Sequence, residues 1–240
     1  MNINFSKLVI FVQQTTPMEK IFNDTQVAFS LKSDTELDRA YFLFKLIDSQ
    51  PLVRIGTAVT NFAIKAHLPV EGLIRATVFD HFCGGVNEDD CLSVVDKMYT
   101  KGVSSVLDYS VEGKEEETQF DAALEMTLKT IEFAKEKQAI PFAVFKPTGF
   151  GRLDLYEKLG AQETLSASEQ KEWSRIEARF DTVCKEAHQK DVALLIDAEE
   201  SWIQIPVDAV TDLMMAKYNK EKVVVFNTFQ LYRHDRLSFL

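Results

Sequence analysis

Polar and charged residues stand directly after several short apolar runs, and these are the side chains best placed to do chemistry. Lys146 follows Ala143-Val144-Phe145. An ammonium group there could pair with the carboxylate of a substrate or, if desolvated, act as a nucleophilic amine. The structural alternative is a lysine that is paired with Asp108 or Asp197, because a charge at the end of an apolar segment is costly unless it has a partner.

Two further runs end in residues of a similar kind. Asp197 follows Ala193-Leu194-Leu195-Ile196 and could serve the same site or cap the next helix. Asn227 follows Val223 to Phe226 and offers both a donor and an acceptor, which suits the edge of a planar heterocycle, although it could also simply form a turn. Glu199 and Glu200 lie further along, and we expect them to face solvent or to cap a helix.

Other candidate groups carry weaker signals. Glu112 could pair with an arginine, but it stands beside the charged run 114–117, which favours a solvated loop. His81 and Cys83 are two residues apart with no second histidine nearby, so we expect neither a metal site nor thiol catalysis.

Familiar nucleotide-binding and hydrolase motifs are missing from the sequence. The close glycine pairs fit neither the GxGxxG fingerprint nor the GxxxxGK[ST] loop, and no GxSxG or HExxH occurs. A nucleotide cofactor would therefore be held in some other way.

The elements that would position these groups alternate between strands and helices. The apolar runs are nearly continuous, which is typical of parallel strands covered on both faces; they span 76–82, 104–110, 142–145, 192–196 and 223–229. Helical spacing of apolar residues is found in 120–137 and from Trp173 to Ala187, with a capping-box pattern at Ser166–Glu169. The pattern predicts an α/β fold whose reactive residues lie at the carboxyl ends of the strands.

The domain organisation follows from counting. Residues 1–70 show helical spacing, as at Leu37, Tyr41 and Phe44, and we interpret them as an N-terminal helical arm. Residues 71–240 supply about five βα units at roughly 30 to 35 residues each, whereas a closed (βα)8 TIM barrel needs eight. We therefore expect a TIM-barrel type of domain that is incomplete at its C-terminus.

The composition of the chain indicates which binding partners and which cellular compartment to expect. The net charge is −10 and the pI is about 5.0, so nucleic acid is not expected as a partner. Three cysteines without metal spacing favour a reducing compartment, and the longest early apolar run, 8–12, is too short for a signal or a membrane span. These features predict a cytoplasmic protein.

Taken together, the strand-end segments resemble the proline dehydrogenase family of flavoenzymes. The resemblance rests on five segments: 77–85 (TVFDHFCGG), 107–112 (LDYSVE), 145–149 (FKPTG), 195–200 (LIDAEE) and 225–232 (VFNTFQLY). The IDAEE and FNTFQ segments are the most specific of these. Similarity extends over roughly residues 70–240.

The resemblance implies noncovalent FAD at the strand ends and oxidation of L-proline to Δ1-pyrroline-5-carboxylate by hydride transfer to flavin N5. It also implies a membrane quinone as electron acceptor and peripheral contact with the inner membrane. The catalytic positions that it implies are Lys146 for the substrate carboxylate, Asp108 and Asp197 near that lysine, and Glu112 as the partner of a substrate-clamping arginine. The implied cofactor contacts are Ala198, Val225 and Asn227, where the family often has Gln at the last position.

One departure from the family bears on activity. The family continues with a sixth strand whose arginine contacts the flavin and with a final helix whose tyrosine and arginines clamp proline, and neither occurs within these 240 residues. We therefore expect this chain alone to bind FAD weakly or not at all and to show no proline turnover. Two alternatives stay open: an inactive, shortened paralogue that acts as an interaction module, and an aldolase-like barrel in which Lys146 forms a Schiff base.

Overall fold

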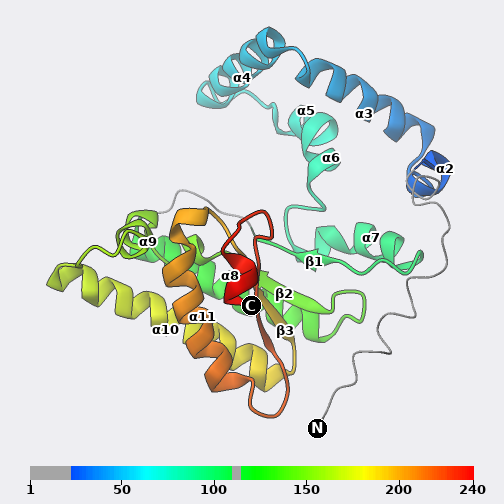
Figure 1. Ribbon diagram of the computed structural model, residues 1–240. Coiled ribbons are helices and arrows are strands. Elements are labelled where there is room, and N and C mark those ends of the chain that lie inside the picture. The colour runs from blue at the N-terminus through cyan, green and yellow to red at the C-terminus, as the bar shows by residue number, and fades with distance from the viewer. Residues whose placement is uncertain (1–22, 110–114) are drawn as a thin grey trace. The chain divides into compact units, whose positions relative to one another are not determined.

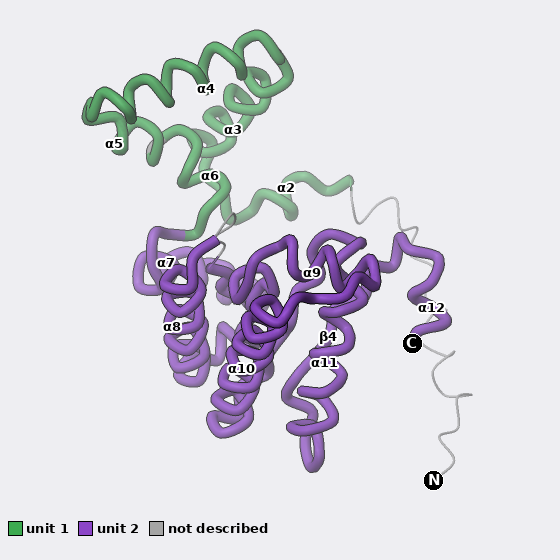
Figure 2. Tube along the Cα trace, turned by 90° about the vertical axis from the view of Figure 1, so that its left-hand side faces the viewer, with its two compact units in different colours: residues 1–84 green, residues 85–240 purple. Residues whose placement is uncertain are grey.

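The chain divides into two compact units. The computed structural model describes residues 23–109 and 115–240, and the units are Met1–Gly84 and Gly85–Leu240 (Figure 2). The helices of the first unit are α2 (Thr25–Ala28), α3 (Asp34–Ile47), α4 (Gln50–Lys65), α5 (Glu71–Ile74), the π-helix η3 (Arg75–Phe79) and α6 (Asp80–Phe82).

The first unit is helical for local reasons. At the start of α3 the side chain of Ser33 accepts a hydrogen bond from the backbone amide of Glu36, and the carboxylate of Glu36 accepts one from the backbone amide of Ser33. Helix α4 carries Pro51 in its first turn. Leu43 of α3 and Ala63 of α4 are buried, whereas larger apolar side chains on the same helices, such as Tyr41 and Phe62, are exposed. Among the described residues of this unit, few apolar side chains are buried.

The strand expected at 76–82 is wrong, because this segment is helical. Residues Arg75–Phe79 form η3 and Asp80–Phe82 form α6, and the hydroxyl of Thr77 donates to the carbonyl of Leu73 at 2.6 Å. A short apolar run that follows a helical stretch cannot be assigned to strand or helix by its periodicity alone. The described residues therefore hold four strands rather than five.

The second unit is built on a parallel sheet. The strands are β1 (Val106–Leu107), β2 (Phe142–Phe145), β3 (Ala193–Ile196) and β4 (Val225–Asn227), all parallel and in the order β1-β2-β3-β4. Each pair of consecutive strands is joined through at least one helix, as parallel pairing requires. This confirms the predicted α/β fold with parallel strands, and β2 matches its predicted span.

The helices of the second unit precede, connect and follow the strands (Figure 1). They are α7 (Glu88–Tyr99), α8 (Glu117–Lys135), α9 (Leu153–Gly160), α10 (Ala167–Lys190), α11 (Gln204–Tyr218) and α12 (Arg236–Phe239), with 3-10 helices η4 (Pro147–Gly149) and η5 (Ser201–Ile203). The predicted capping box at the start of α10 is confirmed, since Ser166 and Glu169 bond reciprocally. Asp191 ends α10 in the left-handed region, with φ of 57°.

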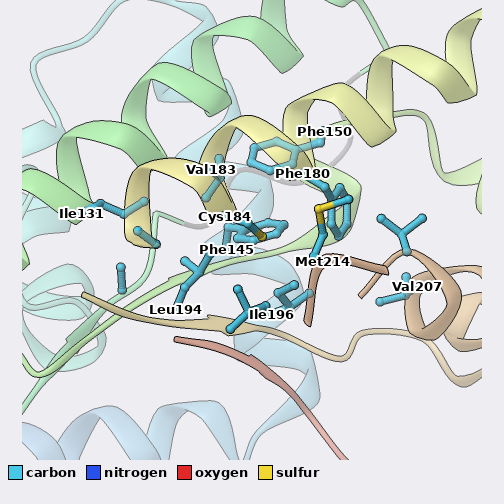
Figure 3. Packing of buried hydrophobic residues seen from close by; sticks show 14 of the residues in the cluster. Ile131, Phe145, Phe150, Phe180, Val183, Cys184, Leu194, Ile196, Val207 and Met214 are labelled. Carbon is cyan, nitrogen blue, oxygen red and sulfur yellow. The ribbon is translucent and has the colours of Figure 1, made fainter. Parts of the chain in front are cut away.

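The core lies between the sheet and these helices. Phe145, Leu194 and Ile196 point from their strands toward α10, which contributes Phe180 and Cys184 (Figure 3). All five side chains are at most 3% exposed. The rings of Phe145 and Phe180 meet edge to face with centroids 5.0 Å apart, a favourable arrangement for aromatic pairs. This packing fixes the strands and therefore the positions of the residues that follow them.

Gly160 allows α9 to approach η5 closely, and replacing it should be costly. An alanine Cβ there would lie 2.0 Å from the carbonyl oxygen of Trp202, a backbone atom that cannot easily move. Gly160→Ala should therefore lower the free energy of unfolding by about 1–3 kcal/mol, although alanine is ordinarily the better helix residue. Urea unfolding followed by circular dichroism measures the change.

Gly56→Ala is the matched control for this prediction. Gly56 lies within α4, and no atom lies within 4 Å of the position that its Cβ would take. This variant should be as stable as the unmodified chain or slightly more stable. Equal stability of Gly160→Ala and the unmodified chain would contradict the close approach.

Candidate active site

The register of the sheet places the polar residues after the strands at one edge. Phe145 pairs with Ile196, and Ile196 pairs with Asn227. Lys146 and Asp197 therefore follow neighbouring strands at the same level, with Asn227 beside them at the end of β4. The carboxyl edge of the sheet gathers these groups, as the sequence predicts.

Lys146 lies near a carboxylate from the end of β1. Its Nζ is 4.0 Å from Oδ2 of Asp108, and the two side chains are 23% and 34% exposed. This is the pairing that the structural interpretation of the lysine predicts. An ion pair of this length between partly exposed side chains is weak.

Asp197 is held by the backbone around it. Its amide donates to the carbonyl of Phe145 at 3.1 Å, and its Oδ1 accepts from the amide of Ala198 at 2.9 Å. The next helical segment, η5, is preceded by Glu200 rather than by Asp197, so Asp197 is not its N-cap. The aspartate thereby orders Ala198, the neighbouring residue that the family resemblance places beside a cofactor.

Neither Glu112 nor Val225 is placed by the described residues as an open group at this edge. Glu112 lies outside the described residues. Val225 has its side chain fully buried in the core, and its amide and carbonyl both bond to the carboxamide of Asn219. A role for either residue in binding or catalysis stays a prediction.

Asn227 makes two hydrogen bonds inside the chain. Its Nδ2 donates to Oδ1 of Asp208 in α11 at 2.9 Å, and its Oδ1 accepts from the amide of Thr228 at 2.8 Å. One N–H and one oxygen lone pair of the carboxamide are not used by these two bonds. The side chain is half-buried at the end of the strand.

Glu199 is a site residue that sequence reasoning missed. We expected solvent exposure or helix capping, but its two carboxylate oxygens accept from the amide and the hydroxyl of Thr148 at 2.9 and 2.7 Å. Its carbonyl accepts from Nε2 of Gln230. Glu199 thus links the segments that follow β2 and β4, and its place two residues beyond Asp197 at a strand end was the available signal.

The ionisation of Glu199 should make the free energy of unfolding depend on pH. Burial raises the pKa of this carboxyl above its ordinary value of 4.5, so the folded chain binds the proton more readily than the unfolded chain does. Glu199 therefore contributes fully to stability at a pH below the pKa that its carboxyl has in the unfolded chain. This contribution is lost as the pH rises through the pKa that the carboxyl has in the folded chain.

Glu199→Gln removes this ionisation and keeps a group that can bond to both atoms of Thr148. We expect the stability of Glu199→Gln relative to the unmodified chain to rise as the pH is raised from about 4.5 and to level off above the folded pKa. Urea unfolding of both proteins at a series of pH values tests this. Parallel pH profiles would show that the carboxyl is not perturbed.

The residues at this edge suit a flavin better than a metal ion. The described residues contain no cluster of three or more histidine, cysteine, aspartate or glutamate side chains that could hold a metal ion. Gln230 has a buried Oε1 without a hydrogen-bond partner among the described residues, and Asn227 keeps one donor and one acceptor. Free amide groups of this kind match the polar edge of an isoalloxazine ring, so the residues present fit FAD.

The enclosed space beside Lys146 is small. A cavity of about 20 Å³ is lined by Lys146, Tyr109, Thr127, Phe150 and their neighbours, which is room for about one water molecule. Any larger ligand of Lys146 must therefore lie over the strand ends rather than in this cavity.

A parallel sheet in sequential strand order, with a helix after each strand and polar groups at its carboxyl edge, is the arrangement found in part of a βα barrel. Residues 91–240 match the family described as "Proline dehydrogenase". The chain belongs to the proline dehydrogenase family.

The chain is also similar to individual curated proteins. The chain is 34% identical over 188 residues to the carbapenem antibiotics biosynthesis protein CarD of Pectobacterium carotovorum, which covers 78% of this chain and 50% of that protein. It is 24% identical over 260 residues to the mitochondrial proline dehydrogenase 1 of Dictyostelium discoideum, covering 92% and 46%. The chain thus spans about half the length of the curated relatives it matches.

A solved structure shows the same fold. The crystal structure of proline utilization A from Bdellovibrio bacteriovorus, inactivated by N-propargylglycine, superposes with a TM-score of 0.58 at 13% identity over 90% of this chain and 23% of that one. Among the described residues, no helix is long and apolar enough to cross a membrane.

Proposed function

We propose that this chain provides the strand-end part of an FAD-dependent site that oxidises L-proline to Δ1-pyrroline-5-carboxylate. The observation that carries the proposal is the position of Lys146, at the carboxyl edge of β2 and level with Asp197, inside the region that matches the family. A cation at this edge is what a small substrate with a carboxylate needs.

The residues of the chain have distinct parts in this proposal. Lys146 binds the proline carboxylate, and Asp108 and Asp197 keep the surroundings of the lysine polar and ordered. Asn227 and Ala198 border the cofactor, which supplies the hydride-accepting chemistry when bound. A quinone as the final acceptor, a cytoplasmic location and peripheral contact with the inner membrane belong to the same proposal.

Flavin absorbance tests the proposal directly. The purified chain is titrated with FAD, and L-proline is then added without oxygen. The same is done with a fusion of this chain to the C-terminal half of a full-length family member. We expect the chain alone to retain little flavin, and the fusion to retain flavin whose absorbance bleaches on adding proline.

Other outcomes would support the alternatives. A folded fusion that retains no flavin would contradict the proposal and favour an interaction module. Trapping of a carbonyl substrate on Lys146 by borohydride would favour the Schiff-base alternative instead. Bleaching by proline in the unfused chain would show that the described strand ends suffice for the half-reaction.

A further inference from the structure

A buried polar cluster lies behind Asn227 at the start of α11. Asp208 and Arg236 are 5% and 3% exposed, and the guanidinium donates to both carboxylate oxygens at 2.6 and 3.0 Å. Gln204, at 1% exposed, donates from Nε2 to Oδ1 of Asp208 at 2.8 Å. The rings of Phe229 and Phe239 lie against the guanidinium, with centroids 5.1 and 4.2 Å from its central carbon.

Stability alone is a poor explanation for such a cluster. Taking two charges out of water costs several kcal/mol, and apolar residues of similar volume often serve as well or better. Buried polar groups that are retained in this way commonly hold another side chain in one orientation. The cluster has one such neighbour at the candidate site, because Oδ1 of Asp208 also accepts from Nδ2 of Asn227.

The bonds of Asn227 admit only one orientation of its carboxamide. The Asp208 carboxylate beside Arg236 accepts hydrogen bonds, so it must face the NH2 group of Asn227, and the amide of Thr228 donates, so it must face the oxygen. Turning the carboxamide over would place donor against donor and acceptor against acceptor. Both contacts oppose that flip.

We propose that Asp208, held in place by Arg236, is a positioning residue that fixes the orientation of the Asn227 carboxamide at the end of β4. The fixed carboxamide offers one N–H and one oxygen lone pair, which suits a planar ring carrying a carbonyl group next to an N–H. This inference rests on the proposed function only in taking that ring to be a flavin.

The test reads the carboxamide itself in the complete 240-residue chain without any ligand. The two side-chain amide protons of Asn227 are observed in a proton–nitrogen correlation spectrum and are assigned by their loss in Asn227→Ala. We expect one of the two to exchange slowly with solvent. Asp208→Asn should shift both signals and make both exchange fast, because an asparagine that turns its oxygen to Arg236 presents its own NH2 group to Asn227.

Asp212→Asn is the matched control, since it makes the same change one turn along α11 at an exposed position. The Asn227 signals should be unchanged in this variant. If Asp208→Asn does not fold, as a spectrum without dispersed signals would show, Asp208→Glu replaces it. This variant keeps the charge but displaces the carboxylate oxygens by one methylene group, and it is expected to alter the same two Asn227 signals. Two fast-exchanging protons in the unmodified chain, or signals that ignore both changes at Asp208, would overturn the proposal.

A second readout uses FAD affinity of the fusion rather than turnover. If Asp208 acts through Asn227, then Asp208→Asn and Asn227→Ala should weaken FAD binding by similar factors. The double variant should bind FAD no less tightly than the single variant with the lower affinity. Additive losses would contradict positioning. A fusion that never binds FAD counts against the proposed function, while the amide spectrum still decides the role of Asp208.

Discussion

Replacing Arg236 with methionine is expected to lower the free energy of unfolding by about 3 kcal/mol or more, because it leaves the buried carboxylate of Asp208 without its cation. Methionine fills much of the volume between Phe229 and Phe239, so the loss reports the missing charge rather than a cavity. The measurement is the urea midpoint and slope of the variant beside those of the unmodified chain.

Arg233→Met is the comparison that isolates burial. Arg233 stands three residues away and pairs with Asp235, whose side chain is 57% exposed, and it also donates to the carbonyl of Ser201. A solvated pair of this kind contributes about 1 kcal/mol or less. Similar losses for Arg233→Met and Arg236→Met would mean that the Asp208 pair is not the buried interaction that we describe.

The sequence was informative about the fold wherever periodicity and length agreed. Residues 142–145 form a continuous apolar run between clear helical stretches, and they are β2. The segment 76–82 is largely apolar as well, although it includes Asp80 and His81, but it follows directly from helix α5, and the hydroxyl of Thr77 bonds one turn back. Strand formation there would need a neighbouring strand, which local sequence cannot reveal.

The site was predictable to the extent that it depends on strand ends. Lys146, Asp197 and Asn227 lie at the expected edge because parallel register follows from the strand pattern. The partners of these residues come from the starts of helices and from loops, so neither Asp208 behind Asn227 nor Glu199 beside Thr148 could be found by spacing. The first pairing depends on how α11 packs against β4, and the second depends on how the segments after β2 and β3 meet.

Lys146→Met should weaken the response to proline without removing the flavin. In the fusion that retains FAD, we expect the proline concentration needed for half-maximal bleaching to rise by about 10- to 100-fold, since a hydrogen bond to a charged group contributes about 1.5–3 kcal/mol. Flavin content should stay the same, because Lys146 is proposed to bind the substrate. Anaerobic titration with proline at the flavin absorbance band measures the change.

The role of the lysine can be separated from its general effect on charge. Lys158→Met removes a lysine of α9 that pairs with Glu169 at the start of α10, and it should leave the proline response unchanged. Lys146→Arg keeps the cation and should lose less than Lys146→Met, although the guanidinium is larger and differently shaped. If Lys146→Met bleached at the same proline concentration as the unmodified fusion, the carboxylate would have to be bound by another cation, and the pairing of Lys146 with Asp108 would be structural only.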